Sequence, residues 1–256
     1  MKIVVIGSGN VATHFARAFH ASGNDIVQVY SRNIAHAQVL ASQLDAQAIN
    51  RFADLAYDAH LYLLAIPDDA LYEVVSQISP KQGIVVHTSG SVPMDVLKPL
   101  SSKIGVVYSP QTFIKSLEMN YSELPFCVEA SDGEVLEQLK NLVLPVSEKI
   151  YDINSDQRRK LHLAAVFVNN FVNALNATGQ DLTRENGVPF DILFPIMAST
   201  AERAKQGDLW QLQTGPAVRG DEQTIGKHRK LLASDPEKLR LYDLLTDLIK
   251  THTQCK

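Results

Sequence analysis

The sequence is poor in cysteine, with Cys127 and Cys255 the two thiols among 256 residues. Two cysteines build no disulfide framework, and neither has the neighbours of a metal site, so we expect no metal and a reducing cytoplasm. An excess of basic charge is also missing, because 24 Lys and Arg stand against 28 Asp and Glu, a net charge of −4. We therefore expect no surface for nucleic acid or anionic lipid.

Long hydrophobic runs are missing as well. The run from Leu161 to Val168 comes nearest, but it includes His162 and falls short of the roughly 18 residues that a membrane span needs. A strand is expected from Lys2, directly after Met1, so no targeting peptide is expected at this end. With 45% hydrophobic and 20% charged residues, the composition is typical of a globular protein.

Strands and helices alternate in the first half of the chain. Most of the strand-like runs are rich in β-branched residues and nearly continuous in apolar ones, as in strands buried on both faces. This alternation predicts a mostly parallel sheet with right-handed crossovers. The runs are Lys2–Ile6, Asp25–Tyr30, His60–Ile66, Gly83–His87, Lys103–Tyr108, Phe126–Ala130 and Glu148–Ile153.

Helices are expected between these strands and through the whole second half, where no strand is expected from Ser155 onward. Gly23 is placed to end the first helix, and Asp68 or Asp69 to cap the third. We expect an α/β domain over residues 1–153 and an all-helical domain over 154–256. The expected helices are Asn10–Ala21, Ile34–Leu44, Asp69–Ile78, Gly133–Leu142, Asp156–Thr178 before Gly179, Phe190–Lys205 kinked at Pro195, Glu222–Ala233 and Pro236–Lys250.

The stretch GSGNVA at residues 7–12 follows the first strand and opens the first helix. In this G-x-G-x-x-A pattern, Gly7 permits a tight turn, Gly9 lets a pyrophosphate approach, and Ala12 lets the helix pack on the sheet. The free N–H groups of the helix start then face the phosphates. The pattern in this context predicts a dinucleotide site, the alternative being a tight turn without a ligand.

The end of the second strand indicates which dinucleotide binds. An acidic residue there would bind the ribose 2′-hydroxyl of NAD, but the sequence has Ser31 and Arg32. A guanidinium can pair with a 2′-phosphate, so NADP is favoured over NAD. The alternative is that Arg32 is a solvated residue at a helix start.

Polar side chains gather where three strands end, in AIPDD (65–69), HTSGS (87–91) and YSPQTF (108–113). Ligands of open α/β sheets lie beyond the carboxyl ends of the strands, so these loops would lie under the cofactor and its substrate. Helix capping by the aspartates, and turn bonding by Ser89 and Ser91, are the alternatives. The expected cofactor residues are Gly7, Ser8, Gly9, Asn10, Val11, Ser31, Arg32, Ile66, Pro67 and His87.

A polar stripe runs along the expected helix 156–178, which is otherwise apolar around most of its circumference and should be buried there. Buried amides need partners, and two interpretations remain. The stripe faces the cofactor cleft, where His162 and Asn169 meet the substrate, or it lies in a helix or subunit interface. The stripe consists of Arg158, His162, Asn169, Asn173 and Asn176.

The segment TGPAVRGD (214–221) shapes a loop near the C-terminus. Arg219 and Asp221 pair with each other or hold a substrate carboxylate. The alternative is a well-formed loop in which Asp221 caps the next helix.

These motifs resemble a known family. GSGNVA, LLAIPDD and a helical second domain are similar to the 6-phosphogluconate dehydrogenase, β-hydroxyacid dehydrogenase and pyrroline-5-carboxylate reductase superfamily. VYSR, HTSGS, PQTF and TGPAVRGDEQT before His228 resemble bacterial proteins that join a Rossmann-like domain to a C-terminal domain of unknown function. The resemblance implies a Rossmann-type sheet, NAD(P) binding, an interdomain cleft and a homodimer through the helical domain.

The function expected is an NADP-dependent reductase of a small carbonyl or imine. His162 would supply the proton, Asn169 and Ser89 would orient the substrate, and Arg219 would neutralise a substrate carboxylate. Lys160 is spaced differently from the catalytic lysine of β-hydroxyacid dehydrogenases, so lysine-based alcohol oxidation is not expected. The alternative is a regulatory or scaffold protein that binds a dinucleotide without chemistry, with His162 packed against a helix away from Gly9.

Overall fold

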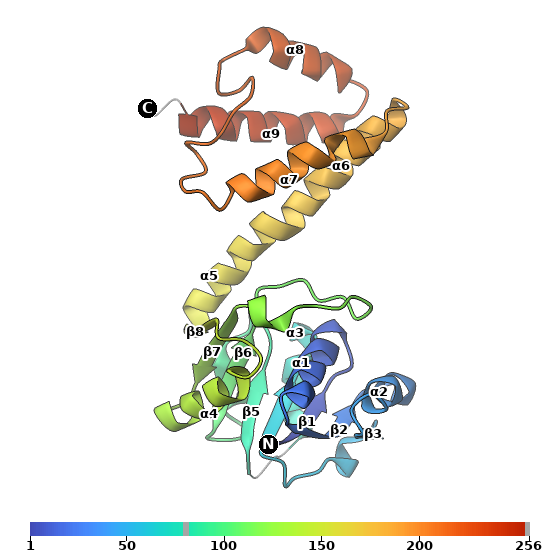
Figure 1. The fold of residues 1–256 in the computed structure, drawn as a ribbon, viewed down its shortest axis with the longest axis vertical. Helices are drawn as coiled ribbons and strands as arrows, with labels where there is room; N and C mark the ends of the chain where they lie inside the picture. The colour runs from blue at the N-terminus through green and yellow to red at the C-terminus, as the bar shows by residue number, and fades with distance from the viewer. Residues whose placement is uncertain (79–81, 254–256) are drawn as a thin grey trace. The chain divides into compact units, whose positions relative to one another are not determined.

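The computed structural model describes residues 1–78 and 82–253 (Figure 1). The chain divides into two compact units. The first, Met1–Asn169, contains the sheet and is called the sheet unit; the second begins at Asn170 and is called the helical unit. The division falls within the long helical segment that follows residue 153, because the first turns of this segment pack with the sheet.

The sheet unit is built on one eight-stranded sheet with the order β3-β2-β1-β4-β5-β6-β7-β8. Neighbouring strands are parallel except for β6 and β7, which are antiparallel, so the mostly parallel sheet is confirmed. The strands are β1 Lys2–Ile6, β2 Asp25–Tyr30, β3 Gln47–Ile49, β4 Leu61–Leu64, β5 Ile84–His87, β6 Ile104–Tyr108, β7 Phe126–Ala130 and β8 Ile150–Asp152.

Two features of the sheet were not expected from the sequence. Strand β3 has three residues at the sheet edge, too short and too polar to give an apolar run. Strand β7 runs antiparallel to β6 because the connection between them is a long loop with one 3₁₀ turn, η3 (Tyr121–Glu123), rather than a crossover helix.

Helices cover both faces of the sheet (Figure 1). Strand residues alternate between two apolar clusters, since Ile3 and Val5 lie in one cluster and Val4 and Ile6 in the other. The first cluster contains residues of α1, α2 and α4, and the second contains residues of α3. The helices of this unit are α1 Asn10–Ala21, α2 Ile34–Ala41, α3 Asp68–Gln77, α4 Gly133–Val143 and α5 Ser155–Ala165.

The expected helix ends in this unit are partly right. Gly23 follows α1 with φ +84°, a left-handed conformation that ends the helix as expected. The expected cap of α3 by Asp68 or Asp69 is wrong: Pro67 precedes the helix and no side chain caps it. Asp68 instead accepts a hydrogen bond from the Ser91 hydroxyl.

The helical unit has no strand among its described residues, as expected. The predicted stop at Gly179 is wrong: the helix continues to Glu185, and Gly187, with φ +66°, follows its end. Pro195 causes no kink, because it lies in the first turn of a helix that starts after a 3₁₀ turn. The helices are α6 Val172–Glu185, α7 Phe194–Arg203, α8 Glu222–Leu231 and α9 Pro236–Thr253, with the 3₁₀ turn η5 Phe190–Leu193.

None of the helices in the described ranges 1–78 and 82–253 combines the length and the apolar character needed to cross a membrane. Cys127 is a buried free thiol on β7. Cys255 lies outside the described residues.

Candidate functional site

The glycine turn joins β1 to α1 at the point where the strand order reverses, since β1 lies between β2 and β4. Gly7 is required by the protein itself, because its φ is +127° and a Cβ there would lie 2.2 Å from the Ala65 carbonyl oxygen. Gly9 has an ordinary φ of −74°, and nothing lies within 4 Å of its Cβ position. The bare Gly9 backbone therefore leaves open space, as the close approach of a pyrophosphate requires.

The start of α1 also suits an anion. Gly9 occupies the N-cap position without a side chain, so no side-chain oxygen caps the helix. The first backbone bond joins Thr13 N to Gly9 O at 3.0 Å. The N–H groups of the first turn are therefore available to a phosphate.

One cavity, called the Arg32 cavity, has a volume of about 320 Å³ on the β2 side of the glycine turn. The Ser8 hydroxyl donates to the Ser31 hydroxyl at 3.0 Å, which links the glycine turn to the end of β2. Arg32 is exposed at the cavity wall. The lining residues are Gly7, Ser8, Gly9, Tyr30, Ser31, Arg32, Phe52, Ala65, Ile66, Pro67, Ala70, Glu73, Val74 and Gln77.

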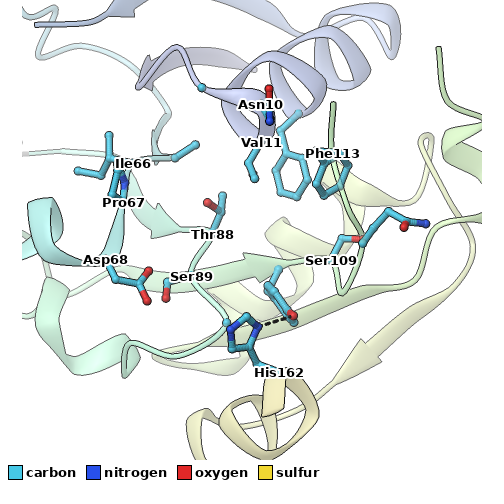
Figure 2. Close-up of a pocket in the computed structure, with 16 residues that line it drawn as sticks. Asn10, Val11, Ile66, Pro67, Asp68, Thr88, Ser89, Ser109, Phe113 and His162 are labelled. Atoms are coloured by element: carbon cyan, nitrogen blue, oxygen red, sulfur yellow. Dashed lines mark hydrogen bonds between the residues drawn. The ribbon is translucent and has the colours of Figure 1, made fainter. Parts of the chain in front are cut away.

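A second cavity, called the His162 cavity, has a volume of about 390 Å³ and shares Gly9, Ala65, Ile66 and Pro67 with the first (Figure 2). It brings together the glycine turn, the strand-end loops and α5. The lining residues are Gly9, Asn10, Val11, Phe15, Ala65, Ile66, Pro67, Asp68, Thr88, Ser89, Gly90, Tyr108, Ser109, Gln111, Phe113 and His162.

His162 lines the same cavity as Gly9, in the arrangement expected if it faces the cofactor cleft. Its Nδ1 lies 3.1 Å from the phenolic oxygen of Tyr108, the bond drawn in Figure 2. Gly90 makes room for this pair: a Cβ there would lie 2.6 Å from His162 Nδ1 and 2.9 Å from Tyr108 Cε2. The sequence did not indicate Tyr108 as a site residue, although Tyr108 begins the strand-end motif YSPQTF.

Arg158 lies one helical turn before His162 and is 1% exposed. It pairs with Glu129, and it donates to the carbonyl oxygens of Ser89 at 3.1 Å and Val92 at 2.6 Å. These bonds fix α5 to the loop after β5 and so position His162. Arg158 was predicted on the same face as His162, but nothing in the sequence indicated its partner on β7.

Two serines in the cavity wall differ in their hydrogen bonds. The Ser89 hydroxyl accepts from the N–H groups of Ser91 at 3.1 Å and Val92 at 3.0 Å, so it shapes the turn. The Ser109 hydroxyl is buried and has no hydrogen-bond partner among the described residues. A buried hydroxyl in this state is unusual, and its position at the cavity makes it available to a ligand.

His87 is the one expected cofactor residue that lines neither cavity. It is completely buried, and its Nδ1 accepts from Ser89 N at 3.1 Å. Burial, with a smaller effect of the Arg158 charge, lowers the pKa of His87 to about 4. The neutral ring lies beneath the loop and stabilises it, and a role for His87 toward the cofactor stays a prediction.

The polar stripe is interrupted beyond His162. Residues Val166–Phe171 form a π-helical segment, so the α-helical wheel does not extend to Asn173 and Asn176. Asn169 donates from Nδ2 to Thr112 Oγ1 at 2.7 Å. The expectation that this helix is buried around most of its circumference is wrong for the single chain, since Leu163 is 59% and Val168 72% exposed.

Arg219 lies in the helical unit, exposed in the turn before α8. Asp221 caps this helix by accepting from Thr224 N at 3.0 Å, the alternative expected from the sequence. A role for Arg219 toward a substrate stays a prediction.

Two family models match the chain. One, described as a Rossmann-like domain, matches residues 1–109, and the other, described as a domain of unknown function (DUF2520), matches residues 124–249. A protein of Bacteroides fragilis, provisionally described as an NADP oxidoreductase, is 40% identical, with a TM-score of 0.91 and 98% of each chain covered. A comparison with curated proteins finds no match.

Two further solved structures share the fold. A 1-pyrroline-5-carboxylate reductase from Streptococcus pyogenes is 15% identical, with a TM-score of 0.65 and 98% of each chain covered. A reductive aminase from Aspergillus terreus, in complex with NADPH and ethyl-5-oxohexanoate, is 15% identical, with a TM-score of 0.73 over 99% of this chain and 93% of that one. The chain therefore belongs to the family that joins a Rossmann-like domain to the DUF2520 domain, with the fold of the expected superfamily.

Proposed function

We propose that the chain is an NADP-dependent reductase of a small carbonyl or imine. The observation that carries this proposal is the shared cavity, in which the glycine turn and the titratable His162 meet. The description of the Bacteroides fragilis relative as an NADP oxidoreductase supports the same chemistry. The reductive aminase in complex with NADPH supports the imine as one substrate class.

The residues present fit the dinucleotide. The open space at Gly9 and the uncapped start of α1 suit the pyrophosphate. Ser31 and Arg32, in the adjoining Arg32 cavity, suit the 2′-phosphate of NADP. When bound, NADPH supplies the hydride.

The chain's own residues would bind, orient and protonate the substrate. His162 lines the cavity and would donate the proton. The Ser89 hydroxyl accepts two N–H bonds and so keeps its own proton to donate. Asn169, held by Thr112, and Arg219 are proposed to orient the substrate and to neutralise its carboxylate.

Thermal unfolding with NADPH or NADH tests the cofactor, since a ligand bound only to the folded state raises Tm. NADPH should raise Tm more than NADH does, and Arg32→Gln should remove the difference. A screen of carbonyls and imines, read by NADPH oxidation, then tests the reaction. His162→Ala should keep the Tm shift and lose turnover. Binding of NADPH without consumption by any such compound would favour a regulatory or scaffold protein.

We also propose that the protein is a cytoplasmic homodimer joined through the helical unit. Ile192 is 64%, Phe194 54% and Ile196 61% exposed on η5 and α7. Such a group of large apolar side chains marks a surface that another molecule covers. Sedimentation should give a dimer that Ile196→Glu dissociates, and a monomer at all concentrations would contradict this.

A further inference from the structure

Tyr108 has no role in the reductase proposed above, yet its phenol contacts His162 in the same cavity. We infer that the two side chains form a proton relay, in which Tyr108 donates to Nδ1 of the neutral His162 ring and the proton on Nε2 passes to the substrate. This inference rests on the proposed function.

The geometry singles out this pair. The phenolic oxygen lies 3.1 Å from Nδ1, and the two rings meet edge to face with centroids 6.0 Å apart. Gly90 leaves the space that the pair occupies. No other hydrogen bond of the His162 ring occurs in residues 1–78 and 82–253, so Nε2 is available to a ligand in the cavity.

A relay solves a problem of protonation. A neutral imidazole that gave up its Nε2 proton alone would become an imidazolate, which is too basic to form. In the relay, the Tyr108 O–H bond breaks and an Nδ1–H bond forms, while the Nε2–H bond breaks and a bond from hydrogen to the substrate oxygen or nitrogen forms. The ring stays neutral, and Tyr108 is left as a phenolate that takes a proton from water after the product leaves.

The surroundings of the pair keep Tyr108 protonated before the transfer. Burial, with a smaller effect of Cys127, raises the pKa of Tyr108 to about 12, so the phenol holds its proton at neutral pH. The nearby Arg158 charge opposes this rise and therefore stabilises the transient phenolate. Asp68 in the cavity wall and the neutral His87 beneath the loop are the other titratable groups at this site.

Nitrogen-15 NMR of the labelled full chain tests the pair without turnover. The His162 signals are those lost in His162→Ala. In the wild type above pH 8, we expect the proton on Nε2 and a hydrogen-bonded Nδ1. Tyr108→Phe should move the Nδ1 signal to that of an unbonded nitrogen. A proton on Nδ1 in the wild type, or an Nδ1 signal that Tyr108→Phe leaves in place, would overturn the inference.

The pH dependence of kcat tests the relay itself. The wild type should keep its kcat from pH 7 to pH 9, because the relay needs only the neutral ring. In Tyr108→Phe only a charged imidazole can donate, so kcat should fall as the pH rises from 7 to 9. Parallel profiles for the two proteins would refute the relay.

Tyr62→Phe is the matched control. Tyr62 is also buried, and its phenol donates to the Ala56 carbonyl oxygen at 3.0 Å, but it does not line the His162 cavity. This variant loses a buried hydroxyl and should keep the wild-type pH profile. If no substrate is ever reduced, the proposed function fails, while the NMR measurement still decides whether the pair exists.

Discussion

Arg158 donates from Nε to the backbone oxygen of Ser89 at 3.1 Å, so a residue of α5 holds the loop that follows β5. The same guanidinium pairs with Glu129 on β7. One buried side chain thus joins three elements that are distant in sequence. The position of His162, one turn further along α5, depends on this contact.

Arg158→Met should destabilise the sheet unit strongly. It leaves the Glu129 carboxylate without its partner, and breaking a buried ion pair from one side costs about 3–5 kcal/mol. Arg159→Met is the control, because within residues 1–78 and 82–253 exposed Arg159 forms one ion pair, with exposed Asp156 on the same helix. Urea unfolding measures the free energy of unfolding of both variants. Equal losses of this free energy would contradict a special role for Arg158.

Gly7→Ala and Gly9→Ala should separate folding from binding. A methyl group added at Gly7 meets a carbonyl oxygen at 2.2 Å, so Gly7→Ala should lower Tm sharply. Gly9→Ala has free space and should keep Tm, but it should weaken NADPH binding at least tenfold, about 1.4 kcal/mol. Titration calorimetry measures the affinity of Gly9→Ala for NADPH. An unchanged affinity would show that the pyrophosphate does not bind at this turn.

Ser109→Ala should not destabilise the protein, because the buried hydroxyl has no partner to lose in the described part of the chain. Ser147→Ala is the control: Ser147 is also buried, and its hydroxyl donates to the Leu124 oxygen at 2.7 Å. The free energy of unfolding of the control, measured in urea, should fall by about 1 kcal/mol. If Ser109 contacts a ligand, Ser109→Ala should raise KM or the Kd of NADPH; no change in either would leave the hydroxyl without a function.

His87 should make stability depend on pH. The pKa of His87 in the folded protein is about 4, against 6.5 for the free side chain, so the unfolded chain takes up a proton first as the pH falls. The stability that the neutral His87 ring contributes is fully present above pH 6.5 and is lost between pH 6.5 and about 4. Over this range the free energy of unfolding falls by about 3 kcal/mol.

Urea unfolding of the wild type and His87→Gln between pH 4 and pH 8 measures this contribution. The difference in free energy of unfolding between the two proteins should change in favour of the variant as the pH falls. A difference that stays constant over this range would show that His87 does not titrate in this way.

Local patterns were sufficient to predict most of the fold. The buried strands of the first half are continuous apolar runs, and the glycine turn follows the first of them directly. Strand β3 could not be predicted because the sheet edge needs little apolar surface. The helix past Gly179 could not be predicted either, because its continuation is set by tertiary structure rather than by the propensity of one glycine.

Single motifs indicated most of the residues that line the two cavities. GSGNVA and Ser31-Arg32 are local patterns, and His162 stood out because it is a polar residue on an apolar helix. Tyr108 and Arg158 depend on partners 54 and 29 residues away, and no local spacing indicates such pairs. The burial of His87 could not be predicted, because a strand end does not reveal which side of the loop the side chain takes.

The wall common to the two cavities, made of Gly9, Ala65, Ile66 and Pro67, implies that the site is modular. A molecule that reaches both compartments must contact this wall, and each compartment then holds a different end of the molecule. Fragments of a dinucleotide, such as adenosine 2′,5′-bisphosphate and nicotinamide mononucleotide, should then each occupy one compartment. Selectivity for the coenzyme and selectivity for the substrate can consequently evolve by separate substitutions.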